Sequence, residues 1–298
     1  MTAQDRWSRW LLEQRFGGDA AAAERGMSQL RSVRDRVLEK AQLGPGMTLL
    51  DVGAGDGLIA FGALDCVGET GHVIFSDVSQ PLLDRCRQLA ADIGVLDRCS
   101  FVRAAADDLS PIADASVDAV TTRSVLIYVA DKAAAFREFH RVLKPGGRVA
   151  LFEPINRATF ERPWPGEEVE AVRDFAQRLR AFYGELQPVD SDPMMNFDER
   201  DLLRLCEAAG FKNVRLEFHL LLVPSPPQKW ETFINSPGNP NIPPLAEAMK
   251  QLFNDEEERL LETHVRPRVE SGGGQAASAV AYLRATKEKA PTKERNDA

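Results

Sequence analysis

Three glycines at alternate positions follow a short apolar run and form the part of this sequence best suited to chemistry. The run Leu49–Val52 contains one acid, Asp51, and leads directly into Gly53, Gly55 and Gly57. Glycine has no Cβ, so this spacing lets the backbone turn tightly and lets a ligand lie directly against it. A helical pattern follows, and its first amides can face that ligand. We therefore predict a strand, a ligand-binding turn and a helix.

The glycine spacing differs from the dinucleotide-binding fingerprint. Leu58 occupies the place of the third glycine or alanine of that fingerprint, and an acid two residues before Gly53 is also foreign to it. A glycine-rich turn can also connect a strand to a helix without binding a ligand. This stretch alone leaves both alternatives open.

A second apolar run favours a nucleoside ligand. His72–Asp77 ends in a carboxylate about twenty residues after the glycine turn, where a βαβ nucleoside site places the acid that binds the ribose hydroxyls. Two carboxylate oxygens can accept both hydroxyl hydrogens. Asp77 therefore argues against an empty turn.

These residues and two later motifs resemble the class I S-adenosylmethionine-dependent methyltransferases. The resemblance extends from about Met47 to Phe152 and rests on Asp51–Gly57, Asp77, Ala106–Leu109 and Arg141–Gly147. Several motifs in order are more specific than one glycine turn. The resemblance implies S-adenosyl-L-methionine as cofactor and a methyltransferase activity.

The resemblance also implies roles for single residues. Asp51 would orient the glycine turn and engage the methionine amino group, and Asp107 with the backbone of Ala106 would read adenine. Arg123 could bind a substrate acid or the cofactor carboxylate, or be a surface arginine. The residues expected to bind the cofactor are Asp51, Gly53, Ala54, Gly55, Gly57, Asp77, Val78, Ala106, Asp107, Arg123 and Ser124.

The pattern of the whole chain predicts an α/β fold. Short apolar runs, which are typical of strands, alternate with helical patterns. The apolar runs are Thr48–Val52, His72–Asp77, Ser100–Ala104, Val117–Thr122 and Arg148–Phe152. Val214–Val223 and Ala277–Thr286 add a closing hairpin. We predict a doubly wound, mostly parallel seven-stranded sheet with an antiparallel terminal strand and a helical cap, and a ligand beyond the carboxyl ends of the strands.

We divide the chain into six segments. A proline-rich insertion interrupts the hairpin and is predicted to be a lid whose Trp230 and Phe233 offer a flat apolar surface to an acceptor. The segments are 1–46, an N-terminal helical cap; 47–153, the cofactor-binding core; 154–223, a cap segment and the return to the sheet; 224–275, the lid; 276–286, the last strand; and 287–298, a flexible tail.

Composition excludes several classes of function. The 298 residues carry 37 basic and 45 acidic side chains, and a net charge of −8 predicts no general attraction to nucleic acid or anionic lipid. The polar N-terminus and the short apolar runs argue against a secretion signal or a membrane span. Four scattered cysteines lack metal-ligand spacing and are interpreted as reduced packing thiols of a cytoplasmic protein. The oligomeric state stays open, with a homodimer as one option.

A cap around a modest pocket favours a small-molecule acceptor. We expect in-line transfer of the methyl group to an oxygen nucleophile, in secondary metabolism, without a metal. The candidate general bases are Glu153, Tyr183, His219 and His264. A tRNA or protein methyltransferase and a non-catalytic protein that binds S-adenosylmethionine remain as alternatives.

Overall fold

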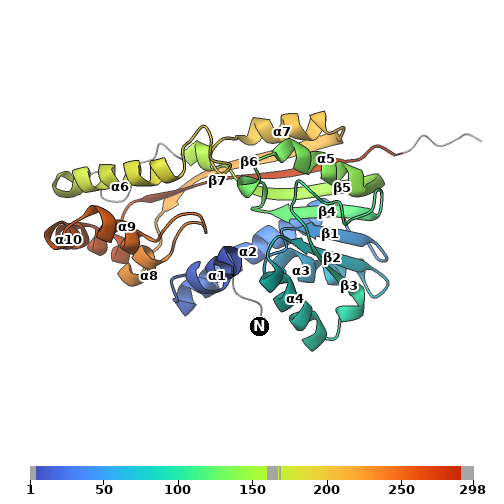
Figure 1. Ribbon diagram of the computed structural model, residues 1–298, viewed down its shortest axis with the longest axis horizontal. Coiled ribbons are helices and arrows are strands. Elements are labelled where there is room, and N and C mark those ends of the chain that lie inside the picture. The colour runs from blue at the N-terminus through green and yellow to red at the C-terminus, as the bar shows by residue number, and fades with distance from the viewer. Residues whose placement is uncertain (1–4, 160–166, 168, 290–298) are drawn as a thin grey trace, which may run out of the picture. The chain divides into compact units, whose positions relative to one another are not determined.

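A seven-stranded sheet with the order β3-β2-β1-β4-β5-β7-β6 organises the chain (Figure 1). The computed structural model describes residues 5–159, 167 and 169–289. The first five strands pair in parallel wherever they are neighbours. Backbone hydrogen bonds join Gly146 to Lys287 and Ile155 to Ala279, so β7 runs antiparallel to β5. The predicted fold class is confirmed. The strands are β1 (Thr48–Val52), β2 (His72–Asp77), β3 (Cys99–Arg103), β4 (Val117–Arg123), β5 (Leu143–Pro154), β6 (Lys212–Pro224) and β7 (Gln275–Thr286).

The described chain separates into two units. The sheet unit contains Val33–Glu153, Glu199–Glu217 and Ala281–Ala298, and the helical unit contains Met1–Ser32, Pro154–Asp198 and Phe218–Val280. Each unit has its own group of buried apolar side chains. We describe them one at a time.

In the sheet unit, helices cover a sheet whose central strands are buried. The helices include α3 (Leu58–Val67), α4 (Gln80–Asp92), α5 (Lys132–Val142) and α7 (Glu199–Ala208), with the 3₁₀ turns Leu96–Arg98 and Leu126–Tyr128. Phe75, Phe136 and Phe139 are fully buried among leucines and valines of the strands. Ser79 caps α4 and Asp131 caps α5 through side-chain oxygens that accept backbone N–H bonds. These caps fix where both helices begin.

Strand β5 is longer than the sequence predicts. The sequence predicts this strand over Arg148–Phe152, after Pro145 and two glycines that favour a turn. The structure instead starts β5 at Leu143, which pairs with Val117, and the backbone of Gly146 and Gly147 bonds to Lys287. Pairing with β4 on one side and with Lys287 on the other therefore extends β5 through a segment whose composition is typical of a turn.

The helical unit packs around its own core. Its helices are α1 (Arg6–Arg9), a π-helix (Trp10–Gln14), most of α2 (Ala20–Ala41), α6 (Arg173–Leu186), α8 (Trp230–Asn235), α9 (Leu245–Leu252) and α10 (Asp255–Ser271), with the 3₁₀ turns Asn156–Thr159 and Glu170–Val172. The indole of Trp10 donates to the carbonyl of Pro237 at 3.0 Å. Among the helices of the described residues, none has the length and apolar content needed to cross a bilayer.

One predicted helical pattern of the insertion forms two helices. Apolar residues recur with helical periodicity over Leu245–Val265, but α9 ends at Leu252 and α10 begins at Asp255, with Asn254 as its N-cap. The Asn254 side chain accepts the N–H groups of Glu256 and Glu257, and the Glu257 carboxylate accepts the N–H of Asn254. This capping box starts a new helix, and the acids after it lie in its first turn, as predicted.

Trp230 was predicted to offer an apolar surface to the acceptor, and this prediction is wrong. This side chain is only 3% exposed and packs with Leu245, Met249 and Leu261 in the core of the helical unit. Phe233 is partly buried against the same cluster. The burial of this large apolar ring stabilises the helical unit, because an aromatic side chain removes much apolar surface from water.

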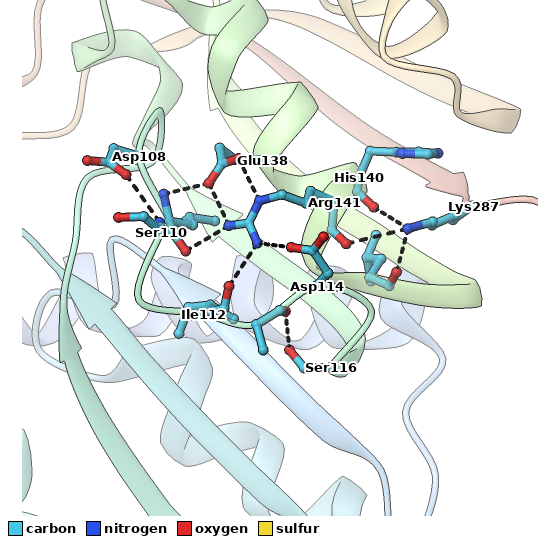
Figure 2. Close-up of polar contacts among 12 residues, drawn as sticks. Asp108, Ser110, Ile112, Asp114, Ser116, Glu138, His140, Arg141 and Lys287 are labelled. Atoms are coloured by element: carbon cyan, nitrogen blue, oxygen red, sulfur yellow. Dashed lines mark hydrogen bonds and ion pairs between the residues drawn. The ribbon is translucent and has the colours of Figure 1, made fainter.

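Arg141 on α5 fixes the loop that follows β3 (Figure 2). Its guanidinium donates to the carbonyls of Leu109 at 2.8 Å and Ile112 at 2.9 Å. It also pairs with Asp114 and Glu138, at 2.6 Å and 2.7 Å. Glu138 in turn accepts the N–H of Leu109 at 2.8 Å. One arginine and one carboxylate therefore bind three backbone groups of this loop: the N–H and the carbonyl of Leu109 and the carbonyl of Ile112.

Lys287 belongs to the same side of the sheet unit and not to a flexible tail (Figure 2). Its ammonium donates to the carbonyls of His140 and Leu143 at 2.8 Å, which are left open at the end of α5. The prediction of a tail from Lys287 onward is wrong at this residue, because a helix end recruits it as a cap. Residues 290–298 lie outside the described part.

We expect Arg141→Lys to lower the free energy of unfolding by about 1–3 kcal/mol, because a lysine cannot reach both carbonyls and both carboxylates at once. Arg137→Lys is the matched control, since Arg137 lies on the same helix, is 63% exposed and makes only a 3.7 Å ion pair. Urea unfolding followed by circular dichroism measures both. Equal effects of the two substitutions would contradict the proposed anchoring of the loop.

Candidate functional site

The glycine turn adopts a backbone that requires glycine. Gly53, Gly55 and Gly57 have φ angles of 67°, 57° and 83°, in the left-handed region. A Cβ on Gly53 would lie 2.2 Å from Cγ2 of Val125, and one on Gly57 would lie 2.5 Å from the ring of Phe61. Gly57 is also the N-cap of α3, whose first N–H groups have no partner within the helix. The predicted turn is thus a close-packed cradle of backbone at a helix N-terminus.

Asp77 lies against this turn, as the spacing predicts. Its Oδ2 accepts the N–H of Gly55 at 2.9 Å and its Oδ1 accepts the N–H of Ser79 at 2.8 Å. The residue is 6% exposed at the end of β2. A carboxylate offers about four acceptor positions, so these two bonds orient it and are compatible with hydroxyl donors from a ribose.

Asp51 is buried at the end of β1, directly before the turn. Thr121 of β4 donates to its Oδ1 at 2.8 Å. Burial raises the pKa of Asp51 to about 7, and the bond from Thr121 and the charge of Arg123 act in the opposite direction. A cation brought next to this carboxyl would favour its ionised form, which suits the role expected for it toward an amino group.

The turn after β4 is held by Glu153. Ser124 has a φ of 56°, rare for a residue with a side chain, and its N–H donates to the carbonyl of Phe152 at 2.8 Å. Glu153 is fully buried. Its Oε1 accepts the N–H groups of Val125 and Leu126, both at 3.0 Å, and its Oε2 accepts that of Ile127 at 3.3 Å.

The surroundings of Glu153 are unlike those of a solvent-facing base. Burial raises its pKa to about 7, while the three amide donors act to lower it. Both oxygens are engaged by the backbone, so proton uptake from an acceptor would compete with these bonds. The catalytic role predicted for Glu153 remains a prediction, and the geometry shows a structural one.

A shallow pocket of about 320 Å³ lies beside the ends of β2 and β3. Its backbone is tied to the acid of β2, because the N–H of Ala104 donates to the carbonyl of Asp77 at 3.2 Å. Ala106 is buried and Asp107 half-buried next to it. The lining residues are Val78, Arg103, Ala104, Ala105, Asp108, Ser110 and Pro111. Of these, only Val78 was among the residues expected to bind the cofactor, although Ala104, Ala105 and Asp108 lie in the segment that was expected at the ligand-binding edge; Arg103, Ser110 and Pro111 flank that segment, and this adjacency was the available signal.

The cradle fits the cofactor that the resemblance implies. The turn presents backbone without side chains at three alternate positions, and Oδ1 of Asp56 is buried without a hydrogen-bond partner among the described residues. The predicted cofactor residues at 51–57, 77–78, 106–107 and 123–124 all belong to the sheet unit. Arg123 is half-buried at the end of β4.

Three of the four candidate bases belong to the helical unit. The hydroxyl of Tyr183 donates to the carbonyl of Pro243 at 3.3 Å, and burial raises its pKa to about 12. His219 lies on β6 and His264 on α10, and both are half-buried. Their catalytic roles remain predictions.

We expect Asp51→Asn to change how stability depends on pH. The pKa of Asp51 is about 7 in the folded protein, and the ordinary value of 3.8 applies to the unfolded chain. Between pH 3.8 and pH 7 the folded state therefore keeps a proton that the unfolded state releases. Stability therefore falls as pH rises through this window, and asparagine removes that fall. Relative to wild type, the variant should gain up to about 4 kcal/mol between pH 4 and pH 7.

Urea unfolding at several pH values measures this difference. Asp92→Asn, on the exposed side of α4, is the control and should follow the wild type at each pH. A constant difference between Asp51→Asn and wild type would show that the pKa of Asp51 is not raised.

Comparison with known proteins agrees with this geometry. A family described as a methyltransferase domain matches residues 50–151. The ubiquinone/menaquinone biosynthesis C-methyltransferase UbiE of Klebsiella pneumoniae is 32% identical over 177 residues, which cover 57% of this chain and 68% of that protein.

Two solved structures share the fold. A structure described as a putative methyltransferase of Bacillus halodurans aligns with a TM-score of 0.53 and 18% identity, over 87% of this chain and all of that one. The [4+2]-cyclase SpnF aligns with a TM-score of 0.53 and 21% identity, over 87% of this chain and 81% of that one. The motifs, the cradle they build and the relatives together place the chain in the class I S-adenosylmethionine-dependent methyltransferase family, with S-adenosyl-L-methionine as its cofactor.

Proposed function

We propose that this methyltransferase acts on a small organic molecule and methylates a carbon atom of an electron-rich ring, as in a phenolic precursor of a quinone. The observation that carries the choice of carbon is the likeness to C-methyltransferases of quinone biosynthesis over more than half of the chain. It replaces the oxygen acceptor and the secondary metabolism that we expected from the sequence.

The chain's own groups would hold the cofactor from three sides. Asp77 would accept the ribose hydroxyls, and the Val78 and Ala106–Asp107 side of the pocket would take the adenine. The glycine turn and the N-terminus of α3 would face the methionine carboxylate, because a helix N-terminus favours negative charge. Asp51 would face the amino group, whose positive charge offsets the burial that raises the pKa of this carboxyl.

The bound cofactor supplies an electrophilic methyl group on a positively charged sulfur. The protein contributes mainly by alignment, since holding the nucleophile at near-attack distance converts a bimolecular step into an intramolecular one.

A phenolic acceptor explains why the choice between carbon and oxygen is a matter of orientation. A base removes the hydroxyl proton, and the resulting anion carries negative charge on oxygen and on ring carbons. Attack of a ring carbon on the methyl group breaks the sulfur–carbon bond, and loss of the proton from that carbon restores the aromatic ring. The anion's oxygen could react in the same way, so the atom placed in line with the methyl group decides the product.

We propose His219 and His264 as candidate bases ahead of the other two. The unprotonated ring nitrogen of a histidine can accept a proton, and histidine is the most frequent general base in enzymes. Tyr183 stays protonated near neutral pH, because its pKa is raised to about 12. Glu153 binds three backbone N–H groups.

Asp77→Asn tests the cofactor site. The amide keeps the shape of the side chain but replaces one acceptor oxygen by a donor, so we expect the affinity for S-adenosylmethionine to fall by about 1.5–3 kcal/mol. Isothermal titration calorimetry measures it, with Asp92→Asn as the surface control and NAD as the control ligand. Unchanged affinity, or tighter binding of NAD than of S-adenosylmethionine, would contradict the assignment.

The acceptor atom is tested with cofactor that carries a ¹³C-labelled methyl group. We expect transfer to demethylated quinol precursors and related phenols, with the label in a ring-bound methyl in the NMR spectrum of the product. A labelled methoxy group would restore the oxygen acceptor. Label found only in tRNA or protein would overturn the small-molecule acceptor.

A further inference from the structure

We propose that Glu153 is a positioning residue that holds the glycine turn in its binding conformation through Val125, and that it thereby sets the affinity for the amino-acid end of the cofactor. The inference concerns a residue that sequence reasoning assigned to proton transfer. It rests on the cofactor assignment above, and it goes beyond that assignment in naming a group that need not touch the cofactor.

Glu153 anchors the turn after β4 through hydrogen bonds to its backbone. Three successive N–H groups, those of Val125, Leu126 and Ile127, converge on one fully buried carboxylate at 3.0 to 3.3 Å. These amides begin the 3₁₀ turn Leu126–Tyr128 and have no partner within it, so the carboxylate binds donors that the turn itself cannot satisfy. Bonds to a carboxylate are about twice as strong as those to a neutral acceptor.

These hydrogen bonds maintain a strained backbone conformation at Ser124. Ser124, directly before the three amides, has a left-handed φ of 56°. A residue with a side chain adopts this region at an energetic cost and keeps it only where the surroundings impose it. The bond from its N–H to Phe152 and the anchoring of the next three residues by Glu153 are those surroundings.

Val125 connects the anchored turn to the glycine turn. Cγ2 of Val125 occupies the place where a Cβ of Gly53 would be, 2.2 Å from that position, so the valine packs on the Cα of Gly53. Gly53, Gly55 and Gly57 all have positive φ angles, and glycine is the residue with most freedom to leave them. Val125 therefore supports one side of the turn, while Asp77 holds Gly55 from another.

The position of Gly53 determines which end of the cofactor is affected. Gly53–Gly57 leads into the N-terminus of α3, which favours an anionic group, and the carboxylate is the only anion of S-adenosylmethionine. The ribose depends on Asp77, whose bond to Ser79 is independent of Glu153. Loss of the Glu153 contacts should thus weaken binding of the amino-acid end and leave the nucleoside end nearly unchanged.

Two ligands separate these ends. S-adenosylhomocysteine carries the amino acid, and 5′-methylthioadenosine lacks it. In calorimetry, we expect Glu153→Gln to weaken S-adenosylhomocysteine roughly tenfold and to leave methylthioadenosine close to wild type, since the amide turns a donor toward one of the three N–H groups. Glu69→Gln, at an exposed glutamate before β2, is the matched control.

A double-mutant cycle tests the route through Val125. Val125→Ala removes the contact with Gly53, so it should cause the same ligand-selective loss, and the double variant should lose less than the sum of the two. Hydrogen exchange at residues 125–127 should quicken in Glu153→Gln and not in Val125→Ala.

Three outcomes would overturn the proposal. These are equal weakening of both ligands by Glu153→Gln, strict additivity in the cycle, and full S-adenosylhomocysteine affinity in Val125→Ala. The last measurement decides the matter even if Glu153→Gln does not fold. Failure to bind methylthioadenosine in the wild type would instead contradict the cofactor assignment itself.

Discussion

The packing of Val125 on Gly53 is the constraint on which the rest of the site depends. A side chain at position 53 would need space that the valine already fills, so only glycine fits there, and its φ of 67° lies in the left-handed region that also favours glycine. This contact joins the turns after β1 and β4, which are neighbouring strands of the sheet. The ligand cradle is therefore built by two turns pressed against each other.

Carboxylates that accept backbone N–H groups hold the loops of the sheet unit. Asp77 binds the N–H groups of Gly55 and Ser79, Glu153 binds those after β4, and Glu138 binds that of Leu109. Loops cannot satisfy their own backbone as helices and strands do, so an acid with two oxygens is an efficient partner. The same residue type thus serves as ligand group at one position and as backbone anchor at another.

This double use explains why the roles of acids are difficult to assign from sequence. Asp77 and Glu153 both end parallel strands, and ligands bind at the carboxyl ends of such strands. Both were predicted to act on small molecules. The difference lies in which N–H groups each carboxylate meets, and those groups come from residues that are distant in the chain.

Local pattern alone determined the doubly wound sheet, the glycine turn, the acid at the end of β2 and the start of α10, because each depends on periodicity, turn chemistry or capping within a few residues. Only the tertiary structure decided that Trp230 is buried, that Lys287 caps α5, and that Glu153 grips the turn after β4. These outcomes depend on contacts between segments that are remote in sequence. Burial and hydrogen-bond partners of that kind have no signature in the residues nearby.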